Sequence, residues 1–305
     1  MIDNLKIYST KKNEFENHIK LNQIVDLKQF YEPFTGEIKP YPLKGKKLNL
    51  DIAINEKTAF ITGSFHKQYN LDNDLGSQNH NDFNYSKIKL TTEQIIETFK
   101  IAKSTSITNL ELGFNIIINE DPQKYIDDYL LMYDLKAPNR NEKFLGKGDY
   151  KEFRKTDYYF KIYNKSKPYK LDKNILRVEI KIIRKRLLEL LGVYSLENIL
   201  EKKVLNNIFE LLMQKFEGLT IIDEFNEIDI PPDELERLKN YMNDNYWIRI
   251  KQRKTSKQIY TFKKDFRMLQ IKYKLNKTKD EIRRKLYSKF NELINDYDCS
   301  QKKVA

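Results

Sequence analysis

Alternating apolar and polar residues in the first half of the chain predict strands interleaved with helices. Residues 48–54 (LNLDIAI) and 58–66 (TAFITGSFH) predict two neighbouring strands. Residues 71–82 (LDNDLGSQNHND) are rich in Asp, Asn, Gly and Ser, which predicts a loop. The segment TTEQIIETFKIAKS then predicts a helix, because its apolar residues recur at helical spacing and Thr91 and Gln94 are spaced as a capping box.

The next predicted strand, residues 109–118 (NLELGFNIII), separates its two faces most clearly. Leucine, phenylalanine and isoleucine occupy one face at period two, while Glu111, Gly113 and Asn115 occupy the other. Glycine inside a strand weakens it and often marks the close approach of another group. A face with a carboxylate, a glycine gap and an amide is therefore unusual for a purely structural strand.

Two later segments, residues 158–165 (YYFKIYNK) and 175–182 (ILRVEIKI), also predict strands with one polar face. The residues on these polar faces are Tyr159, Lys161, Tyr163 and Lys165 in the first, and Arg177, Glu179 and Lys181 in the second. We therefore predict an α+β fold with a mostly antiparallel sheet and helices on its apolar side. The opposite side of the sheet is lined by Glu, Lys, Arg and Tyr.

Helical patterns replace strand patterns after Lys185, and the segment IDIPPDE marks a break before a second module. We predict a first domain over residues 1–200 and a mainly helical or winged module over residues 201–305. Residues 280–294 (DEIRRKLYSKFNELI) predict an amphipathic helix in this module.

Positive charge is concentrated in the second module. The 305-residue chain has a net charge of +12, and residues 246–289 contain 16 Lys or Arg against 3 Asp or Glu. A localised basic segment favours a nucleic-acid partner, although a solvated lysine-rich helix face has the same composition. Its aromatic residues either stack on the bases of single-stranded DNA or form a small core. These aromatic residues are Trp247, Tyr260, Phe262, Phe266 and Tyr273.

The cysteine content and the hydropathy of the chain exclude several other classes of protein. The single cysteine, Cys299, excludes a disulfide framework and a cysteine-based zinc site, and it fits a reducing compartment. No run of apolar residues approaches the length of a membrane span, and we expect no membrane partner and no secretion signal.

The polar face of the sheet carries groups suited to cleaving a phosphodiester. Reversible cleavage needs a nucleophile, a metal ion and cations that hold the developing charge. The candidate metal ligands are Glu111, Glu179 and His66, the candidate cations are Lys161, Lys165 and Arg177, and the candidate nucleophile is Tyr163. Each has a simpler explanation. Most of the 20 tyrosines must serve packing, a lone histidine is usually a hydrogen-bonded bystander, and Arg177 with Glu179 is also a plausible salt bridge.

The segments LELGFNI, FKIYNK and ILRVEIKIIRKRL, in this order, resemble the trans-acting rolling-circle replication initiators of small plasmids and filamentous phages. That family carries an Arg-x-Asp-x-x-x-Asp strand, an Ile-Tyr-Asn/Asp-Lys segment and an Arg-Val-Glu strand. Glu111 and Asn115 stand at the two acidic positions, with Glu111 52 residues before Tyr163, and Glu179 follows Tyr163 by 16 residues. GSFHKQYN and NHNDF resemble upstream strands of phage-type members. The resemblance covers about residues 48–200.

The resemblance implies a nicking domain related to the histidine–hydrophobic–histidine (HUH) endonucleases, whose sheet binds one divalent ion. It implies that Tyr163 is the nucleophile that becomes linked to the 5′ end of DNA. It further implies that Glu111 is a ligand of Mg²⁺ or Mn²⁺, with His66 and His80 nearby. Asn115 replaces the family's second carboxylate, so the residue that completes the metal shell stays open.

The partners that follow are origin DNA, single-stranded or in a cruciform or hairpin, a host helicase and a second copy of the chain in a homodimer. The expected location is the cytoplasm of a bacterial host. The main alternative is a non-catalytic, sequence-specific DNA-binding protein for replication or regulation, and a more distant one is an RNA-binding structural protein. The residues expected to bind DNA are Lys161, Arg249, Lys251, Arg253, Lys254, Lys263, Lys264 and Arg267.

Overall fold

Apolar residues at every second position build one large sheet in the computed structural model, which describes residues 1–138 and 150–296. Within these ranges the sheet has nine strands in the order β2-β3-β4-β5-β1-β6-β10-β9-β8, and every neighbouring pair is antiparallel. The strands are β1 (Ile2–Ser9), β2 (Lys28–Tyr31), β3 (Ile38–Lys47), β4 (Leu50–Ile54), β5 (Ala59–Ser64), β6 (Ser106–Ile117), β8 (Tyr150–Arg154), β9 (Tyr158–Asn164) and β10 (Ile175–Ile182). The predicted α+β fold with a mostly antiparallel sheet is confirmed.

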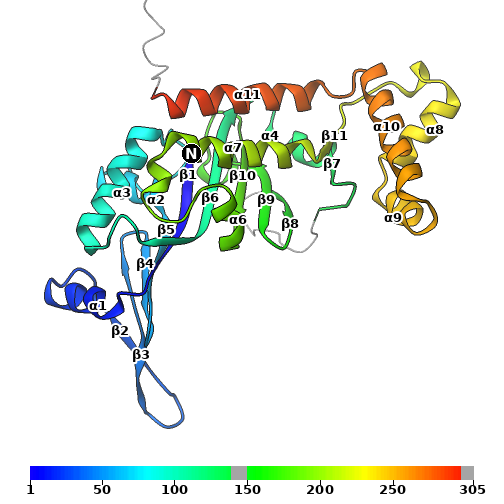
Figure 1. Cartoon of the computed structure of the whole chain (residues 1–305). Helices are drawn as coiled ribbons and strands as arrows, with labels where there is room; N and C mark the ends of the chain where they lie inside the picture. Colours follow the sequence, from blue (N-terminus) through cyan, green and yellow to red (C-terminus); the bar gives the residue numbers. More distant parts are fainter. Residues whose placement is uncertain (139–149, 297–305) are drawn as a thin grey trace, which may run out of the picture.

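A second, two-stranded sheet and the helices complete the described part of the chain (Figure 1). The small sheet consists of β7 (Leu130–Tyr133) and β11 (Leu219–Ile221). The α-helices are α1 (Lys12–Leu21), α2 (Phe65–Asp72), α3 (Tyr85–Phe99), α4 (Pro122–Lys124), α5 (Ser166–Tyr169), α6 (Lys185–Leu190), α7 (Lys202–Glu217), α8 (Pro232–Tyr241), α9 (Asp244–Arg253), α10 (Ser256–Lys272) and α11 (Lys277–Ile294). Single π and 3-10 turns are η1 (Tyr125–Tyr129), η2 (Asn198–Leu200) and η3 (Glu227–Asp229).

Two long helices, α7 and α11, cover the apolar side of the sheet, as Figure 1 shows. Phe114 of β6 packs edge-on against Phe209 of α7 and Phe290 of α11, at ring-centroid distances of 5.4 and 6.1 Å. Phe209 and Phe290 stack on each other at 4.1 Å. Burying aromatic rings of this size contributes a large share of the core energy. The opposite, polar side of the central strands is therefore left for a site.

Helix α3 differs from its prediction at its first turn. It begins at Tyr85, where the side chain of Asn84 accepts a hydrogen bond from the Lys87 N–H, so the predicted capping box at Thr91 and Gln94 is wrong. Thr91 lies within the helix and donates its hydroxyl to the carbonyl of Lys87. An asparagine is a strong N-cap, and it allows the helix to start about two turns earlier than predicted.

A second apolar core lies in the helical module. Trp247 is fully buried against Tyr241 and Phe266, and its indole N–H donates to the Tyr241 carbonyl at 2.7 Å. Tyr260, by contrast, is 68% exposed. The aromatic residues of this segment therefore divide between core and surface, and the module is helical, with no wing among the described residues.

The apolar packing groups α7 and α11 with the main sheet, and α8, α9 and α10 with the second core. The predicted boundary between the two domains, at residue 200, stays a prediction. Figure 1 shows α8, α9 and α10 at one end of the molecule, beyond the end of α11. None of the described helices is long and apolar enough to span a membrane. Cys299 and most of the polar stretch 138–150 lie outside the described residues.

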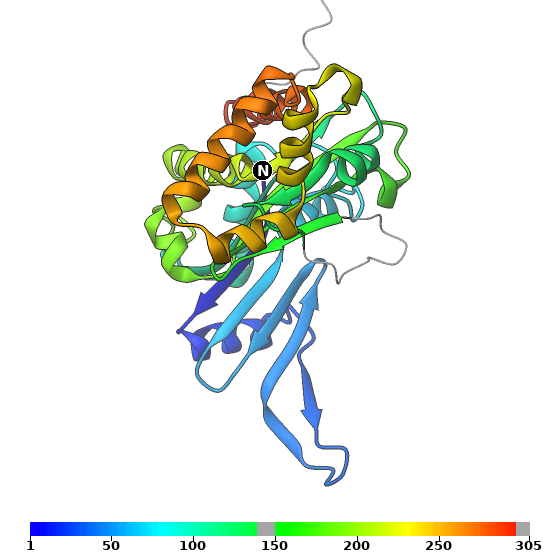
Figure 2. The same ribbon diagram turned by 90° about the vertical axis from the view of Figure 1, so that its right-hand side faces the viewer.

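One hairpin, β2–β3, extends well beyond the rest of the sheet. Figures 1 and 2 both show it projecting from the body of the protein, with α1 beside its base. Every residue of β2 is exposed. The hairpin therefore lies at one edge of the sheet, while β8 forms the other edge.

Candidate active site

A cleft of about 570 Å³ opens on the polar side of the sheet. Its walls come from β1, β3, β4, β5, β6, β8, β9 and β10, from α2 and α5, and from the segment between α2 and α3. The ionisable side chains that line it are Asp3, Asp51, Glu111 and Glu179, Lys46, Lys67, Lys161 and Lys165, and the tyrosines 150, 163 and 169. Acids, lysines and phenols thus meet in one place.

Three carboxylates converge in the cleft. One oxygen each of Asp3, Glu111 and Glu179 lies within 4.8 Å of the others. These residues stand on the neighbouring strands β1, β6 and β10, so the antiparallel pairing itself brings them together. Oxygen ligands of this kind suit a hard divalent cation such as Mg²⁺ or Mn²⁺.

Arg177 lies behind the carboxylates, with only 2% of its surface exposed. Its Nη2 donates to Asp3 at 2.7 Å, its Nε donates to Glu179 at 2.7 Å, and its Nη1 donates to the Asn115 side-chain oxygen at 3.0 Å. A buried guanidinium is tolerated only when its donors are satisfied in this way. Arg177 thus fixes the positions of two carboxylates from the interior and does not line the cleft.

Gly113 creates the space that Arg177 occupies. A Cβ atom at this position would lie 2.8 Å from the Nη2 of Arg177 and 2.8 Å from the Cβ of Glu179. The glycine gap predicted on this strand therefore marks the close approach of a side chain from the neighbouring strand.

The three carboxylates differ in their pKa. Burial and the neighbouring Glu179 and Asp3 raise the pKa of Glu111 to about 8. Burial opposes ionisation of Asp3 and Glu179 as well. The Arg177 guanidinium, together with Lys165 and the Ser64 hydroxyl at Asp3 and with Lys161 at Glu179, outweighs burial and holds both pKa values below their usual range. The cleft therefore holds two paired carboxylates and a third that lacks sufficient positive charge, and this set fits a divalent cation.

Tyr163 lines the same cleft beside the carboxylates. Its hydroxyl donates to the Oε2 of Glu179 at 3.2 Å. Burial and the charge of Glu179 raise its pKa well above the usual value, so the phenol is protonated at neutral pH. The structure brings Tyr163 and Glu179 into direct contact, with Glu111 in the same group of carboxylates.

The two lysines predicted for this face also reach the cleft. The Nζ of Lys161 lies 3.5 Å from Glu179 and 3.6 Å from Glu152. Lys165 follows the end of β9, is buried, and donates to the side-chain oxygen of Asn79 at 2.7 Å. Burial and the charge of Arg177 lower the pKa of Lys165 to about 7.

The predicted imidazole ligand, His66, is not part of the carboxylate group found among the described residues. His66 is buried in α2, where it stacks on Phe83 at 4.9 Å and its Nε2 is 2.6 Å from the Asn81 side-chain oxygen. Burial lowers its pKa to about 3. His80 packs against Tyr169. Neither histidine belongs to the ligand group found among the described residues.

Sequence reasoning missed three residues of the site, Asp3, Asn79 and Tyr169. The Nδ2 of Asn79 donates to Asp3 at 2.6 Å, and its side-chain oxygen accepts from Lys165 and from the Tyr169 hydroxyl, the latter at 2.8 Å. The alternation of residues 2–9 would have revealed β1. The pairing of β1 with β6, which brings Asp3 close to Glu111, depends on tertiary structure and cannot be read from the sequence pattern.

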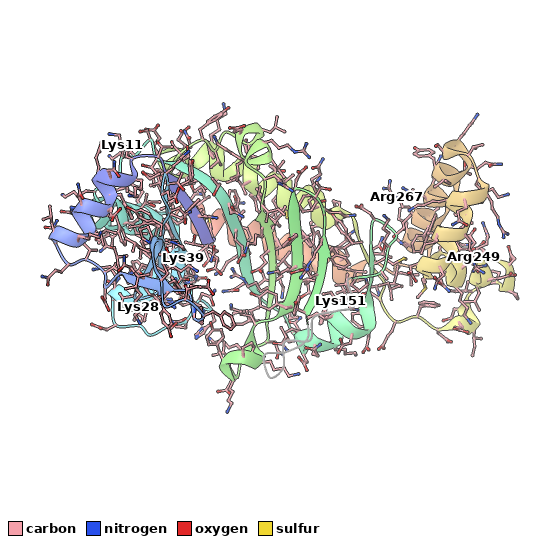
Figure 3. The ribbon with its side chains drawn as sticks, turned by 90° about the horizontal axis from the view of Figure 1, so that it is seen from below. Lys11, Lys28, Lys39, Lys151, Arg249 and Arg267 are labelled. Carbon is pink, nitrogen blue, oxygen red and sulfur yellow. The ribbon has the colours of Figure 1, made fainter. Side chains whose placement is uncertain are left out.

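The cations predicted in the helical module are all exposed. Figure 3 shows Arg249 and Arg267 on the helices at the end away from the hairpin. Desolvation by neighbouring groups and the charge of Lys263 lower the pKa of Lys251 although its side chain is exposed, so positive charge is crowded there. Within the described part of the chain, none of these exposed cations has an ion pair. They are Arg249, Lys251, Arg253, Lys254, Lys263, Lys264 and Arg267.

Comparison with known proteins identifies a similar solved structure, described as a rolling circle replication initiator protein from Geobacillus stearothermophilus. The two chains share 12% sequence identity with a TM-score of 0.38, and the match covers 74% of this chain and 88% of that chain. No protein-family model and no curated protein sequence matches the chain.

Substituting Gly113 with alanine should displace Arg177 and Glu179 at the base of the cleft. The new methyl group overlaps Arg177 and Glu179, and we expect a loss of about 1–3 kcal/mol in the free energy of unfolding, typical of overpacking. Urea denaturation measures this loss. Asn109→Ala, on the same strand and face, is the control. A Gly113→Ala protein as stable as the control would contradict the close approach.

The pKa of Glu111 predicts an unusual pH dependence in metal-free protein. Because its pKa is raised from 4.5 to about 8, this group stabilises the fold fully below pH 4.5, and the contribution is lost as pH rises through about 8. Glu111→Gln removes the ionisation. In EDTA, we expect the melting temperature of the wild type to fall relative to Glu111→Gln between about pH 5 and pH 8. Parallel pH profiles of the two proteins would refute this.

Proposed function

We propose that the chain is a rolling-circle replication initiator that nicks and rejoins one strand of origin DNA through Tyr163, with a divalent metal ion. The observation that carries this proposal is the contact of the Tyr163 hydroxyl with Glu179, within a cleft where Asp3 and Glu111 converge on the same point. The order of the sequence motifs around Tyr163 and Glu179 supports the same class of protein.

In the forward reaction the phenol oxygen of Tyr163 attacks the phosphorus, and the bond from phosphorus to the 3′ oxygen breaks. The products are a 5′-phosphotyrosine and a free DNA 3′-hydroxyl, and attack by such a hydroxyl reverses the step. The phenol proton has Glu179 as its nearest acceptor. Lys161 and Lys165 place positive charge beside the phosphate.

A divalent cation held by Asp3, Glu111 and Glu179 would polarise the scissile phosphate. The raised pKa of Tyr163 indicates why the cleft needs added positive charge before the phenol can lose its proton. In this proposal Arg177 is a positioning residue, because its donors are bound to Asp3, Glu179 and Asn115.

The exposed cations of α9 and α10 are the proposed origin-binding surface, and residues 244–275 contain 10 Lys or Arg against 2 Asp or Glu. The binding of phosphates by such a surface is largely independent of sequence and weakens steeply with salt. Recruitment of a host helicase and formation of a homodimer stay predictions.

Tyr163→Phe tests the proposed chemistry, with Tyr169→Phe as a control from the same cleft. The probe is a random-sequence single-stranded DNA library labelled at its 3′ end and incubated with Mn²⁺. We expect the wild type and Tyr169→Phe to form a labelled adduct that resists denaturation, and Tyr163→Phe to lose it by about three orders of magnitude or more. Binding of the library should stay unchanged.

An adduct that persists in Tyr163→Phe and maps to Tyr169 would overturn the assignment of the nucleophile. The absence of any adduct in the wild type, with binding intact, would favour a non-catalytic DNA-binding protein.

A further inference from the structure

The β2–β3 hairpin carries surface features that folding does not use. Three of its aromatic residues are exposed, with exposed fractions of 45% for Phe30, 68% for Tyr31 and 96% for Phe34. Together with the exposed Ile38 they form apolar surface on an element that projects from the body of the protein (Figure 2). Apolar surface gathered in this way usually marks an interaction site.

Lysines surround these aromatic residues. Residues 28–47 contain five lysines against two glutamates. The strand register places Lys28 directly opposite Lys44, and like charges at such positions destabilise a sheet. The Nζ of Lys44 lies 4.9 Å from the ring centroid of Phe30. Neither Lys28 nor Lys44 has an ion pair within residues 1–138 and 150–296. A polyanion would relieve this repulsion.

The hairpin is continuous with the cleft. Lys46 of β3 lines the cleft and pairs in register with Asp51 of β4, which also lines it. Because side chains two residues apart on a strand share a face, Lys44 points to the same side as Lys46. Lys28, the register partner of Lys44, extends this face outward. The register shifts between Lys28 and Phe30, and the contact of the Lys44 Nζ with the Phe30 ring places Phe30 beside the same lysine. One basic face therefore runs from the carboxylates to the projecting strands.

We propose that the β2–β3 hairpin is a binding surface for the single-stranded DNA that enters or leaves the cleft. Phosphates would contact Lys28, Lys44 and Lys46, and unpaired bases would stack on Phe30 and Phe34. Exposed rings among cations are the usual means of holding single strands without sequence preference. The proposal rests on the proposed nicking function, and it places a second DNA-binding surface far from α9 and α10 (Figure 3).

Charge favours DNA over a second copy of the chain as the occupant. The exposed edge of β2 is open to pairing with another strand. Pairing two copies of this hairpin would, however, bring their lysines together, and the surplus of lysine over glutamate makes that contact repulsive.

The test measures binding of fluorescein-labelled oligothymidylate by anisotropy, in EDTA and in a Tyr163→Phe background, so that no cleavage occurs. Two double variants are compared, Lys28→Glu with Lys44→Glu, and Phe30→Ala with Phe34→Ala. The controls are Lys203→Glu and Tyr194→Ala. Both side chains are exposed, like those of the hairpin, and both lie outside it.

We expect each hairpin variant to bind about tenfold more weakly or worse, since base stacking on one ring is worth about 1–3 kcal/mol. The lysine variant should also lower the slope of log affinity against log salt by about 1.4, at about 0.7 for each lost phosphate contact on a single strand. Both controls should bind like the parent protein.

Hairpin variants that bind like the controls would overturn the proposal. The proposal would also be overturned if the variants changed only the oligomeric state, measured by light scattering. That result would assign the hairpin to a contact between copies of the chain. A failure of the nicking mechanism is seen separately, as adduct formation that does not depend on Tyr163, and it leaves this binding measurement unaffected.

Discussion

The candidate site depends on one buried charge. The guanidinium of Arg177 links Asp3 on β1, Asn115 on β6 and Glu179 on its own strand β10. Burying a guanidinium is costly, and the cost is offset because each of its three nitrogens donates to an oxygen at hydrogen-bond distance. Removing any of these partners leaves a buried N–H of the guanidinium without its acceptor. The same contacts that stabilise the centre of the sheet therefore also fix two of the three carboxylates at the base of the cleft.

This arrangement gives the carboxylates different tasks. Asp3 and Glu179 are ionised because Arg177 compensates them, whereas Glu111 faces the cleft with a raised pKa. The site is thus built for an additional positive charge, while its own cation is turned away from the solvent. Tyr163 contacts the group through Glu179, so the state of the carboxylates and the reactivity of the phenol are coupled. The proposed metal ligands and the proposed nucleophile therefore lie on one set of neighbouring strands.

Periodicity was sufficient to predict the central part of the fold. The faces of β6, β9 and β10 follow directly from alternation, and they place Glu111, Glu179 and Tyr163 on one side of the sheet. Asp3 and Asn79 could not be predicted, because strand order brings the first to the cleft and a hydrogen-bonded loop brings the second. The start of α3 was missed because an asparagine cap competed with a capping-box pattern further on. Alternation could not reveal that Arg177 is buried, because its strand has one apolar and one polar face in the sequence.

The convergence of three carboxylates on one cation is the central claim, and a crystal of the protein soaked in Mn²⁺ tests it most directly. Anomalous diffraction should show one ion in the cleft, bound by oxygens of Asp3, Glu111 and Glu179 at about 2.2 Å, with the Tyr163 hydroxyl open to the cleft beside it. An ion held instead by His66 and His80, or a cleft that stays free of manganese while the protein is fully folded, would contradict the account.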